Sequence, residues 1–203
     1  MFATVDGTGV ILFVRHGQSE ANRDGLLVGH LDVPLTSEGE DQAQELVGKL
    51  GTVVAAWSSP LERARRTGEL AIPTATIEVD SAFIEMNYGE LEGRPLKEVG
   101  ATTWRTLQSD HEWRVPGGES MADVDARVHA RLDALLAEHT EIVTSSQENI
   151  VIFSHVSPIK SAVALALGIH GGAAWRMRLD NATVTAIGAV GGRPSLLRYN
   201  SRP

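Results

Sequence analysis

The sequence contains no cysteine, which excludes disulfide bonds, thiolate nucleophiles and cysteine-ligated metal sites. It also lacks an excess of basic residues, because its formal net charge is -8 at pH 7. An acidic chain is a poor partner for nucleic acids, whose phosphate backbones are bound chiefly by surplus Lys and Arg. The same charge is compatible with a small phosphorylated ligand, since a few arginines in a pocket can create a local positive potential.

We expect neither a signal peptide nor a membrane span in the amino-terminal region, since Met1–Gly9 has no basic stretch and the apolar run Val10–Val14 is too short. No linker rich in Pro, Gly or Ser divides the 203 residues, which predicts a single domain over residues 1–203. We expect a soluble cytoplasmic protein with no nucleic-acid or membrane partner. The sequence leaves open whether the chain forms a homodimer.

Signatures of bound cofactors are missing as well. The chain has neither a phosphate-binding loop nor a dinucleotide fingerprint, because Gly7 and Gly9 precede the first predicted strand instead of following it. The histidines away from the predicted strand ends show no metal-ligand spacing. We therefore expect neither a cofactor nor a metal ion.

The most informative stretch is Val10–Gln18, with the sequence VILFVRHGQ. Its apolar, β-branched and aromatic run predicts a buried strand that ends abruptly in Arg15, His16 and Gly17. In open α/β sheets, ligands bind at the carboxyl ends of the strands, where the following helices begin. Arg15 and His16 are therefore expected to form the floor of an active site.

A second predicted strand, Val53–Ser58, delivers another cation to the same edge of the sheet. Ser59 is expected to cap the helix that follows, and Pro60 suits its first position. This places Arg63 in the first turn of that helix, where it can point into the same crevice as His16.

A further predicted strand, Asn149–Phe153, repeats the arrangement of strand, histidine and helix. It leads into His155, and Ser157 and Pro158 are expected to cap and open the next helix. The amino terminus of a helix presents unpaired N–H groups and a partial positive charge, which suits a phosphate. Glu85 adds a carboxylate beside an aromatic residue and a glycine turn.

The remaining chain predicts an alternation of helices, strands and loops. One long ordered loop is expected over Gly17–Leu35, and loops of that length are usually functional. The other expected elements are a helix capped by Ser37 and ended by Gly51, a short strand Ile77–Val79, helices over Leu96–Leu107 and Met121–Ile142, and a last strand or hairpin over Thr183–Val190 and Ser195–Tyr199.

Two histidines, two arginines and one glutamate at element ends fit one reaction class, the attack on a phosphomonoester. His16 can attack through one ring nitrogen if a backbone carbonyl keeps the other nitrogen protonated. Arg15, Arg63 and His155 would bind the phosphoryl oxygens, and Glu85 would give a proton to the leaving alcoholate. This scheme needs no metal ion.

The same residues carry a resemblance to a known family. Arg15-His16-Gly17, with Ser19 and Asn22 behind it, resembles the RHG signature of the histidine phosphatase superfamily, also called phosphoglycerate mutase-like. The resemblance spans roughly residues 10 to 168 in the family's order. Its further blocks are Leu35-Thr36-x-x-Gly39 with Gln42-Ala43, Ser58-Ser59-Pro60-Leu61-x-Arg63-Ala64, Glu85-x-x-Tyr88-Gly89 with Glu92-Gly93, Gly117-Gly118-Glu119-Ser120 with Arg127, and His155.

The resemblance implies a three-layer α/β/α sandwich with a mostly parallel central sheet. It also implies that His16 is the phosphorylated nucleophile, that Glu85 is the proton donor, and that the partner is a small phosphorylated substrate. Asn22 and Tyr88 are added as substrate-binding candidates. Trp104, Trp113 and Met121 are candidates for the pocket mouth, with ordinary core packing as the competing interpretation.

Three departures from the family pattern refine this expectation. Val156 stands where a glycine usually follows the second histidine, and Val28 stands where the mutases have a hydroxyl residue. Leu96 occupies the position of a mutase lysine that binds the distal part of the substrate. The differences from the mutases at Val28 and Leu96 favour hydrolysis over mutase chemistry. The identity of the substrate stays open. The alternatives are a cofactor-dependent phosphoglycerate mutase and a phospholigand-binding member without catalysis.

Overall fold

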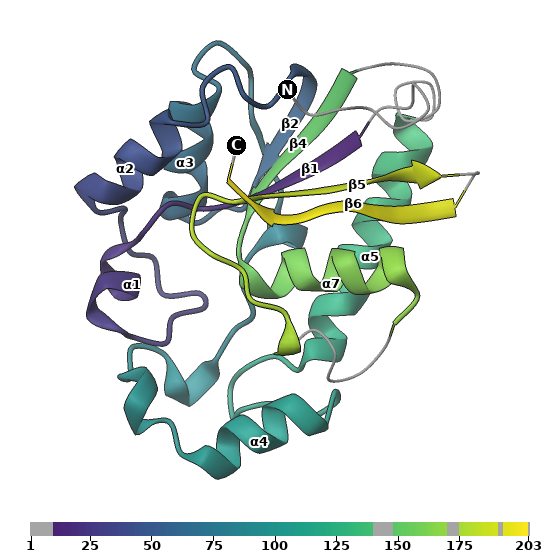
Figure 1. Cartoon of the computed structure of the whole chain (residues 1–203). Coiled ribbons are helices and arrows are strands. Elements are labelled where there is room, and N and C mark those ends of the chain that lie inside the picture. The colour runs from purple at the N-terminus through teal and green to yellow at the C-terminus, as the bar shows by residue number, and fades with distance from the viewer. Residues whose placement is uncertain (1–9, 140–147, 170–174, 191–192, 203) are drawn as a thin grey trace.

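The structure is a computed structural model that describes residues 10–139, 148–169, 175–190 and 193–202. Its helices and strands alternate along the first half of the chain and end in two consecutive strands (Figure 1). In chain order they are β1 (Val10–Arg15), α1 (Glu20–Asp24), α2 (Ser37–Gln44), β2 (Thr52–Ser58), α3 (Glu62–Ala71), β3 (Glu78–Val79), η1 (Ser81–Phe83), η2 (Gly89–Leu91), η3 (Leu96–Glu98), α4 (Ala101–Ser109), α5 (Met121–Glu138), β4 (Glu148–Ser154), α7 (Val156–Leu167), β5 (Val184–Val190) and β6 (Arg193–Ser201).

The strands form one six-stranded sheet with the order β3-β2-β4-β1-β5-β6. The pairs β2–β3, β2–β4 and β1–β4 are parallel, whereas β5 and β6 form an antiparallel hairpin that joins β1 through β5. In the β1–β4 register Arg15 pairs with Ser154, so the two strands end side by side. The residues that follow each strand, His16 and His155, therefore leave the sheet at the same edge.

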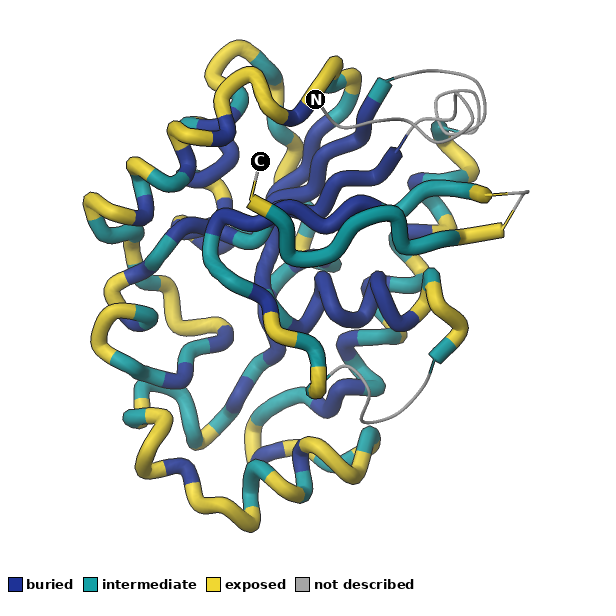
Figure 2. Tube along the Cα trace, in the orientation of Figure 1, coloured by how far each residue is buried: buried dark blue, intermediate teal, exposed yellow. Residues whose placement is uncertain are grey.

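Helices cover both faces of the sheet, and β1 shows why. Its side chains alternate in direction, as strand geometry requires. Ile11 and Phe13 join a buried cluster with residues of α5 and α7, whereas Leu12 and Val14 join a second cluster that includes Ala71 of α3. The predicted three-layer α/β/α fold with a mostly parallel sheet is thus confirmed. The central strands are buried along their length (Figure 2).

The predicted strands are confirmed, with β3 reduced to two residues at the sheet edge. The expected hairpin at the end of the chain is β5–β6. The predicted helix Met121–Ile142 corresponds to α5, and its expected end lies outside the described residues. The expected helix Leu96–Leu107 is divided into η3 and α4.

Three predicted helix starts were wrong by a few residues. Thr36, and not Ser37, is the N-cap of α2, because its side chain accepts the backbone N–H of Gly39. Leu61 precedes α3 without a side-chain cap, so Ser59 is free for another contact. The N-cap position of α7 is His155 itself, which places Ser157 inside the first turn. Side-chain hydrogen bonding decides such boundaries, and the pattern of apolar residues does not reveal it.

Two further loop and helix predictions need correction. The stretch expected as a loop, Gly17–Leu35, contains the short helix α1, which Ser19 and Asn22 cap reciprocally. Helix α2 ends at Gln44, well before Gly51, and turns follow it. Among the described helices, none is long and apolar enough to cross a membrane.

Candidate active site

His16 follows β1 directly and is 4% exposed. Its backbone N–H donates to the carbonyl of Ser154, which holds it beside the end of β4. Its Nδ1 atom lies 2.7 Å from the carbonyl oxygen of Gly17. A carbonyl can only accept, so Nδ1 carries the proton and Nε2 keeps its lone pair. A nucleophilic His16 requires that a backbone carbonyl keep one ring nitrogen protonated, and this hydrogen bond meets that requirement.

Gly17 is required by a close approach of two backbone segments. A Cβ atom at Gly17 would collide with the carbonyl oxygen of Gly39 in α2, and a Cβ at Gly39 would collide with the carbonyl of Gln18. The N–H of Gly17 also donates to Oγ1 of Thr67 in α3 across 3.0 Å. The glycines of two family blocks thus belong to one contact that fixes the backbone behind His16.

Asn181 is a residue of this site that the sequence analysis missed. Its side-chain Nδ2 lies 3.1 Å from the carbonyl of His16, 3.2 Å from that of Gly17 and 3.0 Å from Oδ1 of Asn22. Asn22 also accepts from the N–H of Ser19, so its oxygen is committed to the protein. Asn22 can therefore reach a substrate only through its Nδ2 group. No local signal marks Asn181, which is far from the other residues in sequence.

Of the two predicted arginines, Arg63 is buried and Arg15 is half-buried, and both are only partly hydrogen-bonded. Arg63 is 1% exposed and donates to the carbonyls of Leu31, at 3.1 Å, and Gly29, at 2.7 Å. Arg15 donates to the carbonyl of Leu179. The Nε atom of each arginine is buried without a partner among the described residues. Burial lowers the pKa of both guanidinium groups, which an anionic ligand would counteract.

Glu92 shapes the loop that binds Arg63. Its two carboxylate oxygens accept the backbone N–H groups of residues 29–31, at distances between 2.9 and 3.1 Å. The carbonyls of the same loop face Arg63. A carboxylate can satisfy several N–H donors at once, so Glu92 determines the loop conformation and, through it, the direction of the guanidinium group.

His155 lies next to His16, with their ring centroids 5.1 Å apart. Its Nε2 atom is 2.7 Å from Oγ of Ser59, which also accepts the N–H of Leu61. Because Ser59 already accepts, its hydroxyl proton can go to Nε2, which leaves the proton of His155 on Nδ1. This Nδ1 atom is buried without a partner in the described part of the chain. It is the third such donor of the site.

Both histidines are neutral near pH 7. Burial is the main cause that lowers the pKa of each ring well below 6.5, and the charge of Arg63 is the next. The charge of Arg15 acts in the same direction on both rings. Because the charges of both arginines act on both rings, and the two rings lie side by side, the four side chains form one cluster.

Glu85 is 5% exposed, and its carboxylate lies at the amino terminus of α7. It accepts the N–H groups of Val156 at 3.0 Å, of Ser157 at 3.1 Å and of its neighbour Met86 at 2.7 Å. We expected this helix terminus to suit a phosphate. That expectation was wrong, because the first N–H groups of α7 are occupied by Glu85. The valine at 156 is compatible with this role, since only its backbone is used.

The segment that carries Glu85 is held by a pair of residues from the Gly-Gly-Glu block. Arg127 donates to the carbonyls of Ala82, at 2.7 Å, and of Glu85, at 3.2 Å. Its Nε atom lies 3.0 Å from a carboxylate oxygen of Glu119. Glu119 in turn accepts the N–H of Asn87 at 2.9 Å. These contacts explain the spacing of that block in the sequence.

The aromatic candidates lie in or against the buried core, with Trp104 and Trp113 partly buried beside it. Tyr88 belongs to the buried core, and burial and the nearby Glu85 raise the pKa of its hydroxyl, which is hydrogen-bonded to Ser157. Its contact with a substrate stays a prediction. Met121 is a core residue. Trp104 packs edge-on against Trp175, which the sequence analysis did not identify.

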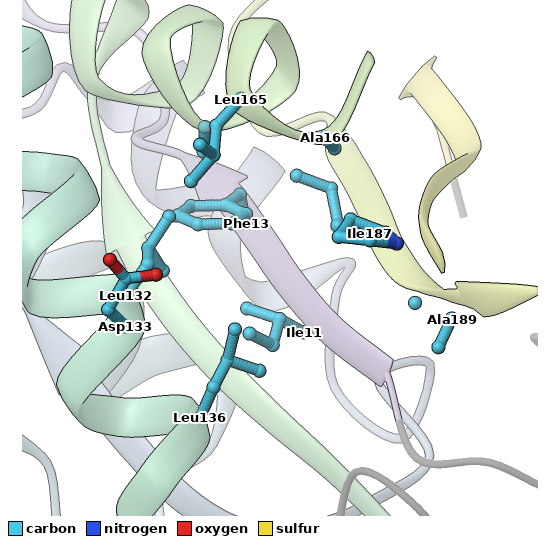
Figure 3. A pocket seen from close by; sticks show the side chains of 12 residues that line it. Ile11, Phe13, Leu132, Asp133, Leu136, Leu165, Ala166, Ile187 and Ala189 are labelled. Carbon is cyan, nitrogen blue, oxygen red and sulfur yellow. The ribbon is translucent and has the colours of Figure 1, made fainter. Parts of the chain in front are cut away.

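An apolar hollow of about 280 Å³ lies on the α5–α7 face of the sheet, away from these groups (Figure 3). Its lining includes Ile11, Phe13, Leu132, Leu165 and Ile187, with Asp133 as the one charged residue. It has no arginine, lysine or histidine in its lining to bind the charge of a phosphoryl group. Within the described ranges, no cluster of three or more His, Asp or Glu side chains could hold a metal ion.

Comparisons with known proteins agree with this geometry. A family model described as the histidine phosphatase superfamily (branch 1) matches residues 11–202. The "Probable phosphoglycerate mutase GpmB" of Salmonella choleraesuis (strain SC-B67) is 32% identical over 186 residues, covering 87% of this chain and 83% of that protein. The same name and identity apply to the relative from Salmonella enteritidis PT4 (strain P125109).

Solved structures extend the comparison to the fold. The α-ribazole phosphatase from Shigella flexneri superimposes with a TM-score of 0.80 at 26% identity, covering 95% of this chain and 96% of that one. A mycobacterial glucosyl-3-phosphoglycerate phosphatase superimposes with a TM-score of 0.87 at 24% identity, covering 96% and 100%. The second similarity supports the fold alone, because its sequence identity is low.

Proposed function

We propose that this chain, which belongs to the histidine phosphatase superfamily, hydrolyses phosphomonoesters through a phosphohistidine on His16. A phosphatase-type enzyme is already supported by the family. One observation carries the finer proposal. The carbonyl of Gly17 holds the proton on Nδ1 of His16, so Nε2 presents an uncharged lone pair near the charges of Arg63 and Arg15. A dianionic phosphoryl group accepts such a nucleophile more readily than a charged one.

In the first step, Nε2 of His16 attacks phosphorus and the bond to the ester oxygen breaks. We assign three donors to the phosphoryl oxygens because each is buried without a partner among the described residues: Nε of Arg15, Nε of Arg63 and Nδ1 of His155. Donors that are already oriented stabilise developing charge without reorganisation, and this is usually the largest contribution to catalysis. No metal ion enters this step.

Glu85 is proposed as the proton donor and, afterwards, as the base. The leaving alcoholate takes a proton from Glu85, and the carboxylate then takes a proton from the water that attacks the phosphohistidine. Hydrolysis of the P–N bond releases phosphate and restores neutral His16. Oε1 of Glu85 accepts the shortest of these bonds, at 2.7 Å from the N–H of Met86, so Oε2 is the oxygen assigned to carry the proton.

Two alternatives remain as different classes of function. A cofactor-dependent phosphoglycerate mutase has support from the names of the Salmonella relatives. Against it, Leu96 is 43% exposed and apolar at the position where we expect a mutase lysine. A phospholigand-binding protein without catalysis is the third class, and the intact set of His16, Glu85 and His155 argues against it.

The first experiment measures phosphate release from a panel of phosphomonoesters in the presence of EDTA. The panel includes p-nitrophenyl phosphate, α-ribazole 5′-phosphate and 3-phosphoglycerate, the last with and without 2,3-bisphosphoglycerate. We expect hydrolysis under chelation and an acid-labile phosphoryl group on the wild-type protein. The matched His16→Ala variant should lose both signals and stay folded.

The other outcomes separate the alternatives. Isomerisation that depends on the bisphosphate, without phosphate release, would establish the mutase. Binding of phosphate or vanadate without any turnover would establish the binding protein. Hydrolysis retained by His16→Ala would overturn the assignment of the nucleophile.

A further inference from the structure

Lys160 of α7 is a buried cation that the proposed mechanism does not use. It is 9% exposed, although lysine is almost never buried without a partner. In the part of the chain that the structure describes, its ammonium group makes no ion pair and no hydrogen bond with another side chain. Its Nζ atom lies over the ring of Trp175, 5.8 Å from the ring centroid.

Lys160 lies on the side of α7 that faces the reacting groups. It follows Ser157 by three residues, so both side chains lie on one face of the helix. The N–H of Ser157 binds Glu85, and the charges of Glu85 and Arg15 both act on Lys160. Burial lowers the pKa of Lys160 and Arg15 lowers it further, whereas Glu85 raises it. Among the described residues, no carboxylate forms an ion pair with this ammonium group, although the charge of Glu85 reaches it.

Two indole rings form the wall next to this cation. Trp175 meets Trp104 of α4 edge-on, with ring centroids 6.5 Å apart and planes at 68°. Both rings are partly buried and pack against the core, so their positions are restrained. Helix α4 lies apart from the sheet, beyond α7 (Figure 1). The cation and the rings thus lie near Glu85, the proposed proton donor to the leaving group.

We propose that Lys160, held by Trp175, forms a subsite for the leaving group and selects phosphomonoesters whose alcohol carries a second anionic group. This inference rests on the proposed function of the site. A carboxylate or a second phosphate would supply the charge that Lys160 lacks, in a partly desolvated position where ion pairs are strongest. The indole rings would contact the carbon skeleton between the two anionic groups.

The test compares two ligands that differ at one group. 3-Phosphoglycerate carries a carboxylate where glycerol 1-phosphate carries a hydroxymethyl group. Their dissociation constants are measured by titration calorimetry with the His16→Ala variant, so that turnover does not interfere. We expect about tenfold tighter binding of 3-phosphoglycerate, which corresponds to ~1.4 kcal/mol. Adding Lys160→Met should abolish this preference, whereas Lys160→Arg should keep part of it.

Controls identify the source of the preference. Lys97→Met removes an exposed lysine of η3 and should leave the affinity ratio unchanged. Trp175→Leu should reduce the ratio, since the ammonium group loses its position. Titration with a bisphosphate in place of 3-phosphoglycerate shows whether the Lys160 subsite binds a second phosphate or a carboxylate more tightly.

Three results would overturn the inference. They are equal affinities for the two ligands, a ratio that Lys160→Met leaves intact, and a loss of affinity by the same factor for both ligands. The last would mean that Lys160 supports the phosphate site without selecting the leaving group. Failure of the proposed function is distinguishable, because it appears as absent hydrolysis by the wild-type protein whatever the affinity ratio.

Discussion

Oγ of Ser59 lies 2.7 Å from Nε2 of His155, which joins the loop after β2 to the residue after β4. The contact explains why Ser59 does not cap α3, since its oxygen accepts the N–H of Leu61 and its proton is available to the histidine. The contact fixes the ring of His155 through Nε2 and leaves Nδ1 buried without a partner among the described residues. Ser59 is thus a positioning residue for the second histidine.

We expect Ser59→Ala to lower kcat/KM by about tenfold or more, because a buried ring nitrogen left without its partner costs about 1–3 kcal/mol. The loss should be similar for all esters, since His155 is proposed to bind the phosphoryl group common to them. The control is Ser58→Ala, which removes a buried hydroxyl that donates to the carbonyl of Ser59. Equal kinetic losses in both variants would contradict the positioning role.

Glu85→Gln should slow esters with poor leaving groups far more than p-nitrophenyl phosphate. The nitrophenolate leaving group scarcely needs a proton, whereas an alkoxide needs one in the transition state. Steady-state kinetics with p-nitrophenyl phosphate and with a sugar phosphate measure the difference. If the variant lost the same factor on both substrates, Glu85 would have to be removed from the role of acid.

Glu92→Gln should raise KM more than it lowers kcat. An amide cannot accept all the N–H groups of residues 29–31 that the carboxylate accepts, so the loop and the bound Arg63 lose their fixed position. We expect an increase in KM of about tenfold. Glu90→Gln is the matched control, because Glu90 is exposed in the same segment. An unchanged KM in Glu92→Gln would separate this loop from substrate binding.

The two buried histidines predict that stability falls in mild acid. Burial holds the pKa of each ring well below 6.5 in the folded protein, whereas an exposed histidine in the unfolded chain has a pKa near 6.5. At pH values between the folded and the unfolded pKa, the unfolded chain therefore binds more protons than the folded protein. Stability is therefore fully present above 6.5 and is lost as the pH falls through this window.

Thermal or denaturant unfolding between about pH 7.5 and about pH 5.5 measures this effect. The wild-type protein should lose more free energy of unfolding over that range than His16→Ala, which has one buried histidine fewer. The His16 ring is also one of the causes that lower the pKa of His155, and the variant removes it. The same pH dependence in both proteins would show that other groups control acid sensitivity.

The interior of the protein was predictable where a local pattern specifies it. The apolar run Val10–Val14 and the similar run before His155 form the adjacent strands β1 and β4, because such runs must be buried on both faces of a parallel sheet. The ends of these strands place His16 and His155 together without further information. Helix starts were less predictable, since Ser37, Ser59 and Ser157 are all reasonable caps by residue type.

The sequence by itself determined the fold class, the residues at the strand ends and the family, because these depend on residue type and spacing along the chain. Only the tertiary structure decided which groups they meet. It assigned the amino terminus of α7 to Glu85, and the carbonyls behind His16 to Asn181. It also placed Trp175 beside Lys160. Such partners are distant in sequence and leave no local signal, since a hydrogen bond or a ring contact is set by packing in three dimensions.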